Sequence, residues 1–166
     1  MTEVEIRRLD VDDLELWKAI RQAALETAPR AFGRTLAGHL ALSDAEHARR
    51  LTCNVILAAF VAGEIVGSVG WRAIDLVTES HRGKINSVFV QPEFQGRGVS
   101  DALMRALLGD ATGAVLQLEL AVTVGQDRAI AFYRRHGFEI FATIPRALCH
   151  DGEFFDEHLM LRYLDA

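Results

Sequence analysis

Cysteine, proline and long apolar runs are scarce in this chain, and each scarcity excludes a class of protein. Two cysteines, Cys53 and Cys149, are too few for a disulfide framework and are typical of a reducing compartment. Three prolines and 50% hydrophobic residues exclude a disordered chain. The longest apolar run, Val55–Ala62, is far shorter than the roughly 20 residues of a membrane-spanning helix.

The N-terminal residues and the length complete this first picture. The chain starts Met-Thr-Glu-Val-Glu, which is acidic where a signal peptide is basic. A length of 166 residues favours one domain. We therefore expect residues 1–166 to form a single cytoplasmic domain that does not enter a membrane.

Lysine is also scarce, because sixteen of the eighteen basic residues are arginine. The net charge of −5 argues against a nucleic-acid surface. Arginine suits bidentate contacts with phosphate, although a codon preference explains most of the sixteen equally well. The six histidines and two cysteines show no metal-binding spacing, so we expect no metal site.

Periodicity predicts a strand and helices, followed by a hairpin, in the first half of the chain. Val4–Leu9 alternates weakly, and helical spacing follows over Val11–Glu26 with Asp10 as its N-cap. Pro29 and Gly33 break this pattern. The remaining elements are a helix from the Ser43 and Glu46 capping box to about Leu51, and a hairpin of Asn54–Ala62 and Ile65–Ile74 turning at Gly63-Glu64.

The second half alternates strands and helices after a polar loop at Asp75–Lys84. The predicted elements are strand Lys84–Gln91, helix Val99–Leu108, strand Leu116–Val124, helix Arg128–His136 with Gly137 as its cap, and strands Phe138–Ile144 and Phe154–Leu164 joined through Asp151-Gly152. This order predicts an α/β (α+β) fold, in which a mixed sheet carries helices on both faces.

A glycine-rich segment after Pro92 is the most informative feature of the sequence. Gly96 and Gly98 bracket the start of an amphipathic helix, where backbone N–H groups lack intrahelical partners. Without Cβ atoms, these glycines let an oxyanion approach the N–H groups, and Arg97 adds a full positive charge. The segment therefore predicts a pyrophosphate site, although a simple glycine-rich connection remains the alternative.

Two better-known phosphate loops are excluded. A P-loop requires Lys-Ser or Lys-Thr, and neither pair occurs in the sequence. The dinucleotide fingerprint requires a third glycine, and Asp101 occupies that position.

Together with a second segment, the loop resembles the signature of the GCN5-related N-acetyltransferase (GNAT) superfamily. The first signature matches Gln95-Gly96-Arg97-Gly98-Val99-Ser100, and the second matches Gln126 through Phe138. Ser100 and Gln126 depart from the usual residues. The resemblance covers nearly the whole chain and includes Arg21…Pro29…Phe32-Gly33, as in members thought to acetylate small molecules. It implies a mostly antiparallel sheet of six to seven strands, with the fourth and fifth strands splayed.

The resemblance implies acetyl transfer from acetyl-CoA to a primary amine of a small molecule. Tyr133 occupies the position of the general acid that protonates the departing thiolate. A backbone N–H near Phe89 or Val90 would polarise the thioester carbonyl. Arg128, Arg134 or Arg135 would meet the adenosine phosphates. The cofactor-binding residues that we expect are Val88, Phe89, Val90, Gln95, Gly96, Arg97, Gly98, Val99, Ser100, Gln126, Arg128, Phe132 and Arg135.

The general base stays open, because no carboxylate stands at Lys84, Ile85 or Asn86, where relatives carry glutamate. The candidates are Glu119, His81, Glu79, Asp156 and His158, each more typical of a structural or solvated residue, and a water chain would also serve.

The acceptor wall is expected from Ala31–Gly33 and Ala147–Phe155. Phe32, Phe154 and Phe155 would line an apolar pocket there, although core packing is the commoner role for such residues. Two other functions stay open, an N-terminal acetyltransferase of proteins or peptides and a non-catalytic acyl-CoA-binding module. Relatives often form homodimers, so a homodimer is also expected.

Overall fold

The sheet of this protein contains seven strands. The computed structural model describes residues 3–165, in which the strands hydrogen-bond in the order β1-β2-β3-β4-β5-β7-β6. The pair β4–β5 is parallel, whereas β1–β2, β2–β3, β5–β7 and β6–β7 are antiparallel. The predicted mixed, mostly antiparallel sheet is therefore confirmed. Close contacts divide the described residues into two compact units, 3–72 with 85–111, and 73–84 with 112–165.

The first unit begins with strand β1 (Val4–Arg8), a 3-10 turn at Val11–Asp13 and helix α1 (Leu14–Thr27). Asp10 caps the 3-10 turn as predicted, because its carboxylate accepts a hydrogen bond from the Asp12 N–H at 2.9 Å. Asp13 returns the capping contact and also accepts two hydrogen bonds from Arg7, at 2.9 and 2.8 Å. These contacts fix the entry of α1.

Two short helices follow α1, and only the second was predicted. A 3-10 turn at Pro29–Ala31 leads to helix α2 (Leu36–Leu40), whose N-cap Thr35 accepts a hydrogen bond from the Gly38 N–H at 3.0 Å. Five residues are too few for a helical period to show. Helix α3 (Asp44–Cys53) starts at the predicted Ser43 and Glu46 capping box.

Strands β2 (Val55–Val61) and β3 (Glu64–Ala73) form the predicted hairpin, but its turn lies one residue earlier than expected. Ala62 and Gly63 have φ angles of 51° and 82°, and Val61 pairs with Glu64. Left-handed conformations at both turn residues match the twist of the strands, so Glu64 belongs to the strand.

Strand β4 (Arg82–Val90) begins earlier than predicted. A 3-10 turn at Val77–Glu79 precedes it, and Arg82, Gly83 and Lys84 pair with Gln117, Leu118 and Glu119 of β5. The expected loop is therefore wrong at Arg82 and Gly83, whereas Lys84 lies in the strand, as the predicted strand Lys84–Gln91 has it. The polar side chains at the start of β4 gave no alternating apolar pattern that would have predicted a strand. Arg82 is tolerated there because it binds Glu119 of the paired strand β5. A 3-10 turn at Pro92–Phe94 and helix α4 (Val99–Ala111) follow.

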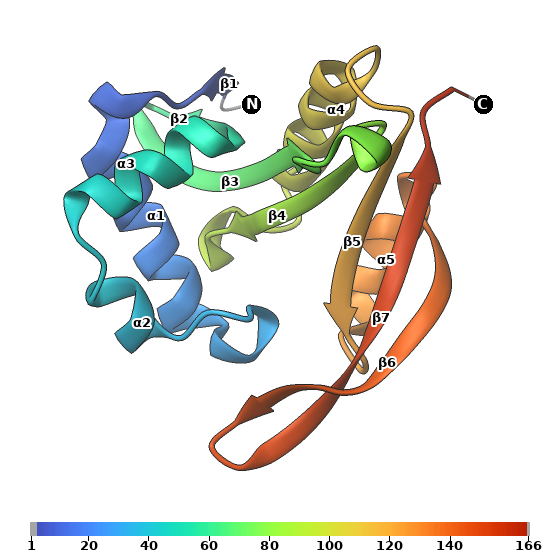
Figure 1. Cartoon of the computed structure of the whole chain (residues 1–166). Coiled ribbons are helices and arrows are strands. Elements are labelled where there is room, and N and C mark those ends of the chain that lie inside the picture. Colours follow the sequence, from blue (N-terminus) through green and yellow to red (C-terminus); the bar gives the residue numbers. More distant parts are fainter. Residues whose placement is uncertain (1–2, 166) are drawn as a thin grey trace. The chain divides into compact units, whose positions relative to one another are not determined.

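The core of the first unit forms between helices and strands β1–β3. Trp17, Ile20 and Ala24 of α1 pack with Leu51 of α3 on the face of β2 that carries Ile56, Ala58 and Phe60. The alternate residues Leu57, Ala59 and Val61 are buried as well. Figure 1 shows α1 and α3 on one side of these strands and α4 on the other, which explains why β2 is apolar on both faces.

The second unit contains β5 (Gln117–Thr123), α5 (Asp127–Arg135), β6 (Glu139–His150) and β7 (Glu153–Tyr163). Leu118, Phe138 and Met160 are its most deeply buried large residues. Asp151 and Gly152 form the predicted turn between β6 and β7. Figure 1 shows these two strands as a long curved ribbon.

Strand β6 ends six residues later than predicted, at His150. The strand continues past Pro145 through an irregular segment. Arg146 adopts a φ of 50°, and the register shifts between Ile144 and Leu148. A bulge accommodates a proline that regular pairing excludes.

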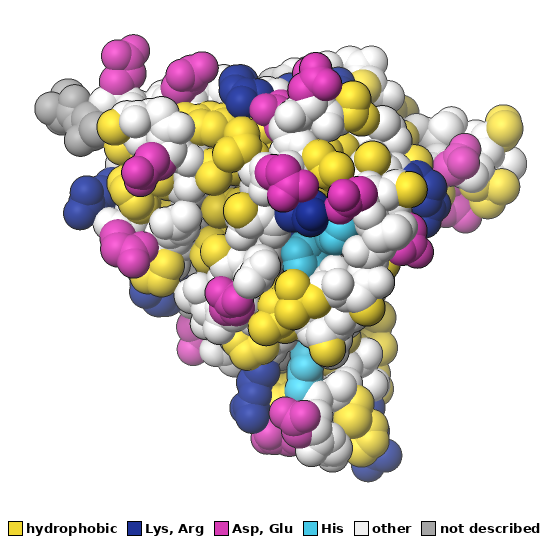
Figure 2. Space-filling view, turned by 90° about the vertical axis from the view of Figure 1, so that its left-hand side faces the viewer, with side chains coloured by type: hydrophobic (Ala, Val, Ile, Leu, Met, Phe, Trp, Pro, Cys, Tyr) yellow, Lys and Arg dark blue, Asp and Glu magenta, His cyan; other side chains and the backbone are white. Residues whose placement is uncertain are grey.

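The surface of the helical face mixes both signs of charge. Figure 2 shows acidic and basic side chains interspersed over this face, without a broad patch of one sign. None of the helices between residues 3 and 165 has the length and apolar character needed to cross a membrane.

Candidate active site

The glycine-rich loop before α4 leaves open space at the helix start. Gly96 and Gly98 have φ angles of 73° and 82°, which L side chains rarely adopt. Apart from the glycine and its two chain neighbours, no atom of the described residues lies within 4 Å of the position that a Cβ would take at either glycine. Helix α4 begins at Val99, and the Ala102 N–H donates its hydrogen bond to the Gly98 carbonyl at 3.0 Å. The loop therefore has the conformation and room that an oxyanion requires.

Neighbouring side chains hold this loop in place. The Gln95 amide donates a hydrogen bond to the Val90 carbonyl at 3.1 Å, which ties the loop to the end of β4. The exposed Arg97 guanidinium lies 5.6 Å from the Phe94 ring centre. Val99 is 1% exposed and faces the core, so only its backbone is available to a ligand. Ser100 is half-buried in the first turn.

Strand β4 has an unusual backbone conformation just before Val88, Phe89 and Val90. Ser87 adopts a left-handed φ of 57°, which the sequence did not indicate. Its carbonyl accepts a hydrogen bond from the Ser68 hydroxyl at 2.9 Å, and its own hydroxyl donates to the Asn86 side chain at 2.9 Å. A non-glycine residue in this conformation costs about 1–2 kcal/mol, so the surrounding hydrogen bonds maintain it.

Two glycines of β3 allow β4 to approach closely. A Cβ at Gly67 would lie 2.9 Å from the Phe89 carbonyl oxygen, and one at Gly70 would lie 2.6 Å from the Asn86 side chain. The contact at Gly67 is with the β4 backbone and would move the strand, whereas the contact at Gly70 would displace the Asn86 side chain. The sequence offered a signal for this role, because isolated glycines inside a strand often mark a close backbone approach.

Helix α5 brings together the predicted residues of the second segment. Tyr133 is 8% exposed and lies edge-on to the rings of Phe132 and Phe138, with centroids 5.3 and 6.1 Å away. Burial raises the pKa of the Tyr133 phenol, so it is protonated at neutral pH. Around it, exposed side chains are those of Gln126, Arg128, Arg134 and Arg135. Arg135 also lies over the Phe132 ring at 5.6 Å.

Two of the predicted base candidates are ion-paired with Arg82. The Arg82 guanidinium donates to both Glu119 oxygens, at 2.6 and 2.9 Å, and to Glu79 at 2.9 Å. The hydrogen bond from Arg82 lowers the pKa of Glu119 despite partial burial. A carboxylate with a lowered pKa is a weak base, which argues against Glu119 as the general base.

The candidates on β7 are engaged in local contacts. Asp156 accepts a hydrogen bond from the Arg146 N–H at 2.8 Å, which supports the irregular part of β6. His158 shares a hydrogen bond with the Thr143 hydroxyl at 2.8 Å. His81 is exposed, and its carbonyl accepts from the Leu116 N–H at 2.8 Å.

Glu157 is the acidic residue that sequence reasoning did not select. It lies on β7, opposite Thr123 of β5 and Ile144 of β6, and it is half-buried. Burial raises the pKa of its carboxyl group, the reverse of the shift at Glu119. A raised pKa brings a carboxylate closer to the range in which general bases work. The sequence gave no reason to prefer Glu157 over the flanking Asp156 and His158. Its pKa shift depends on how deeply the side chain is buried in the fold, which the sequence does not show.

The phenylalanines of the predicted acceptor wall differ in exposure. Phe32 packs against the core of the first unit, as the commoner role suggests. Phe154 is 58% exposed, with the Arg146 guanidinium 5.5 Å from its ring centre, so the preference for core packing is wrong there. Phe155 is half-buried beside His150, with ring centroids 5.9 Å apart.

The family model for the acetyltransferase (GNAT) family matches residues 17–138, which is more than two thirds of the chain. The chain belongs to the GNAT family. Membership confirms the predicted resemblance, and with it an N-acetyltransferase that uses acetyl-CoA as its donor. The matched region ends with the second signature, at Phe138.

Curated relatives match over almost the full length. The chain is 29% identical to the L-amino acid N-acetyltransferase AaaT of Escherichia coli strain K12, over 98% of this chain and 99% of the relative. It is 31% identical to the L-methionine sulfoximine/L-methionine sulfone acetyltransferase of Pseudomonas paraeruginosa PA7, over 96% of this chain and 94% of that protein. Both relatives are N-acetyltransferases of small molecules.

A solved structure agrees with the fold. The putative acetyltransferase yncA from Salmonella typhimurium, determined with its cofactor acetyl-CoA, gives a TM-score of 0.82 at 20% identity, over 99% of this chain and 96% of that one. The GNAT-type mixed sheet is confirmed, whereas the splay of the fourth and fifth strands stays a prediction.

Proposed function

We propose that this protein acetylates the primary amine of a free amino acid or a close analogue in the cytoplasm, with acetyl-CoA as the donor. The observation that carries this proposal is the match, over nearly the whole chain, to N-acetyltransferases of L-amino acids and of methionine sulfoximine and sulfone. The open glycine loop before α4 supports it, because the loop suits a pyrophosphate.

Donor binding is assigned to the two signature segments. The backbone N–H groups from Gln95 to Ser100 and the Arg97 side chain would hold the pyrophosphate. The backbone of Val88, Phe89 and Val90 would pair with the amides of the pantetheine arm. On α5, Arg128 and Arg135 would meet adenosine phosphates, and Gln126 and Phe132 would contact the arm.

Proton transfer is assigned to two residues of the second unit. Acetyl-CoA supplies a thioester whose carbonyl carbon accepts the amine nitrogen as the carbon–sulfur bond breaks. A backbone N–H of Phe89 or Val90 would stabilise the carbonyl oxygen, a contribution of about 3 kcal/mol in comparable sites. Tyr133 would donate its phenolic proton to the sulfur, and Glu157 would accept the proton that the amine loses.

Thiol release from acetyl-CoA with a panel of amines tests this function. We expect turnover with free L-amino acids or L-methionine sulfone, and little with peptides. Tyr133→Phe should lower kcat roughly 100-fold with a nearly unchanged KM for acetyl-CoA, because general acid catalysis contributes about that factor. Tyr163→Phe, which removes the same hydroxyl group from an exposed tyrosine of β7, is the matched control and should leave kcat unchanged.

Other outcomes would contradict this assignment in different ways. Turnover confined to peptides would indicate an N-terminal acetyltransferase of proteins. Binding of acetyl-CoA without turnover on any acceptor would indicate a non-catalytic module. An unchanged kcat in Tyr133→Phe would remove the acid role while leaving the activity itself established.

A further inference from the structure

Arg21 is a buried cation on the inner face of α1. Only 8% of the Arg21 surface is exposed. The guanidinium carbon of Arg21 lies 5.8 Å from the centre of the Trp17 ring and 4.8 Å from the centre of the Phe32 ring. Trp17 precedes it by one helical turn, and Phe32 follows the 3-10 turn after α1. Two aromatic rings therefore cover a full positive charge.

Two donors in this cluster lack acceptors. Among the described residues, neither the Arg21 Nη1 nor the Trp17 indole nitrogen has a hydrogen-bond partner, although both are buried. The charges that act on Arg21 come from Arg50 and Arg34, which are also cations. Burial, with a smaller contribution from these cations, lowers the pKa of Arg21 from 12.5 to about 10, so it remains charged at neutral pH.

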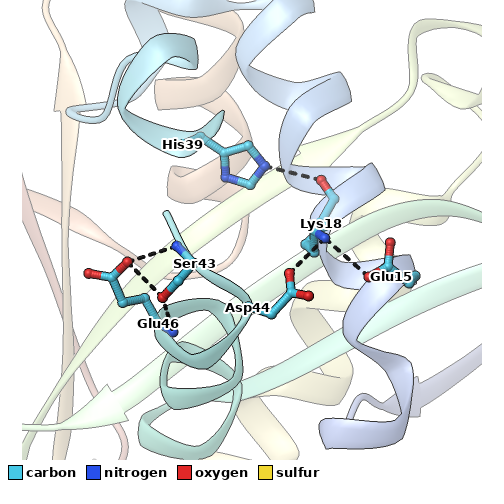
Figure 3. Close-up of polar contacts among 6 residues, drawn as sticks. All are labelled: Glu15, Lys18, His39, Ser43, Asp44 and Glu46. Carbon is cyan, nitrogen blue, oxygen red and sulfur yellow. Dashed lines mark hydrogen bonds and ion pairs between the residues drawn. The ribbon is translucent and has the colours of Figure 1, made fainter. Parts of the chain in front are cut away.

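Several polar groups near Arg21 have partners, although the buried His47 Nδ1 on α3 lacks one, as Arg21 Nη1 does. Figure 3 shows Lys18 donating to Glu15 at 3.1 Å and to Asp44 at 2.9 Å, and the His39 ring nitrogen 3.2 Å from the Lys18 carbonyl oxygen. Buried charges are normally paired, because an isolated one is costly to remove from water. Unlike the Lys18 ammonium, the Arg21 guanidinium is a buried charge with a donor that has no partner.

A hollow adjoins this cluster along the chain. Its volume is about 360 Å³, and Gly33, Arg34, Thr35 and Gly38 line it. Gly33 directly follows Phe32, which covers Arg21, and Arg34 is close enough to lower the pKa of Arg21. Three of the four lining residues are small, which leaves room for a ligand of amino-acid size. Arginine binds a planar carboxylate best through two parallel hydrogen bonds, and the unpartnered Nη1 of Arg21 can supply one of them.

We propose that Arg21 determines acceptor specificity by binding the α-carboxylate of the amino acid that is acetylated, with the Trp17 indole N–H as a second donor. This inference rests on the proposed function, since it names the group by which that same site selects its acceptor. It implies that an amine without a carboxylate leaves Arg21 unpaired and is a poor substrate.

Paired substrates provide the kinetic test. L-methionine sulfone and its α-amide carry the same amine, but only the first carries a carboxylate. In Arg21→Met, we expect kcat/KM for the acid to fall on the order of 100-fold, and that for the amide to change less than about threefold. Arg21→Lys should restore part of the loss with the acid, because it keeps the charge but not the planar fork.

A matched control separates hydrogen bonding from the general positive field. Arg50→Met also removes one cation near Arg21, but it leaves the Arg21 donors in place. It should keep the preference for the acid over the amide. Equal losses on both substrates in Arg21→Met would show a structural role and overturn the proposal, as would unchanged kinetics on both.

A binding measurement separates failure of this inference from failure of the proposed function. In a Trp71→Phe background, Trp17 is the only tryptophan of the chain. Titration with L-methionine sulfone should give a saturable change in its fluorescence, absent with the amide and abolished by Arg21→Met. This result without any acetylation would sustain the carboxylate site while removing the proposed function. Acetylation without the fluorescence change, or a response to inorganic phosphate alone, would overturn the carboxylate assignment.

Thermal melting checks that the variant folds. Arg21→Met replaces a buried, unpaired charge with an apolar side chain of similar length, so its melting temperature without ligand should equal or exceed that of the wild type. In the wild type, saturating L-methionine sulfone should raise the melting temperature, and this rise should disappear in Arg21→Met.

Discussion

Glu157 and Glu119 lie on paired strands of the second unit, yet their carboxyl groups shift in opposite directions. Arg82 donates two hydrogen bonds to Glu119 and lowers its pKa, whereas burial alone raises the pKa of Glu157. The Glu119 carboxylate is ionised at neutral pH and ion-paired with Arg82. The Glu157 carboxyl is the one that can exchange a proton nearer neutral pH.

Glu157→Gln should stabilise the protein at neutral pH. A raised folded-state pKa means that the favourable contribution of the protonated carboxyl is complete below the unfolded value near 4.5, and is lost as the pH rises through the folded value. Glutamine avoids that loss, so the melting temperature of the variant should exceed the wild-type value at pH 7. The difference should vanish below about pH 4. A difference that grew on acidification would contradict the shift at Glu157.

Tyr133 makes a corresponding prediction at alkaline pH. Burial raises its pKa, so the stability from its neutral phenol is complete below the unfolded value of 10.0 and is lost as the pH rises above it. Urea unfolding from pH 8 to 11 should show the wild type losing stability more steeply than Tyr133→Phe. Tyr163→Phe, at an exposed tyrosine, is the control and should follow the wild-type slope.

At the scale of elements, the loop before α4 uses both the positive φ that glycine tolerates and the space that its missing Cβ leaves. Gly98→Ala should destabilise the fold by about 1–2 kcal/mol, because alanine is strained at positive φ. It should also weaken acetyl-CoA binding more than tenfold by calorimetry, since a Cβ fills the space meant for the pyrophosphate.

Gly113→Ala is the matched control for this loop. Gly113 has a φ of 86°, and its Cβ position is equally open. The substitution should cost the same stability and leave acetyl-CoA affinity unchanged. Equal losses of affinity in both variants would attribute the effect to strain, not to the loop.

Elements with strong local signals could be predicted from the sequence, and others could not. The N-cap at Asp10, the capping box at Ser43 and the turn at Asp151-Gly152 rest on local hydrogen bonds and backbone preferences, so residue identity suffices. Helix α2 contains Gly38 and strand β6 contains Pro145, and these residues disfavour a helix and a strand respectively. Both elements therefore depend on packing that the local sequence does not show. The left-handed Ser87 depends on hydrogen bonds from distant residues, so no local pattern announces it.

The candidate site divides in the same way. Gly96, Gly98 and Tyr133 were visible because a signature places them at fixed spacing. Glu157 and Arg21 were not assigned roles, because their character depends on burial and on missing partners. Sequence shows which donors and acceptors exist, whereas only the fold shows which of them are left without water or a partner.

At the scale of the whole molecule, β4 contributes to both compact units. Its first three residues belong to the second unit, and Ile85–Val90 belong to the first. Trp17 and Trp71 both lie in the first unit, and Tyr133 and Tyr163 both lie in the second. Urea transitions followed by tryptophan fluorescence and by tyrosine absorbance should therefore coincide, because losing β4 disrupts both units. Separate midpoints would show that the units unfold independently.

The scarcity of lysine has a consequence for a protein that handles a reactive thioester. Its two lysines differ, since the Lys18 ammonium is held by Glu15 and Asp44 while Lys84 is exposed on β4. Those ion pairs raise the pKa of Lys18 and keep its nitrogen protonated, hence poorly nucleophilic. Spontaneous acylation of the enzyme by its own donor therefore has few side-chain targets, and peptide mass spectrometry would find Lys84 modified ahead of Lys18.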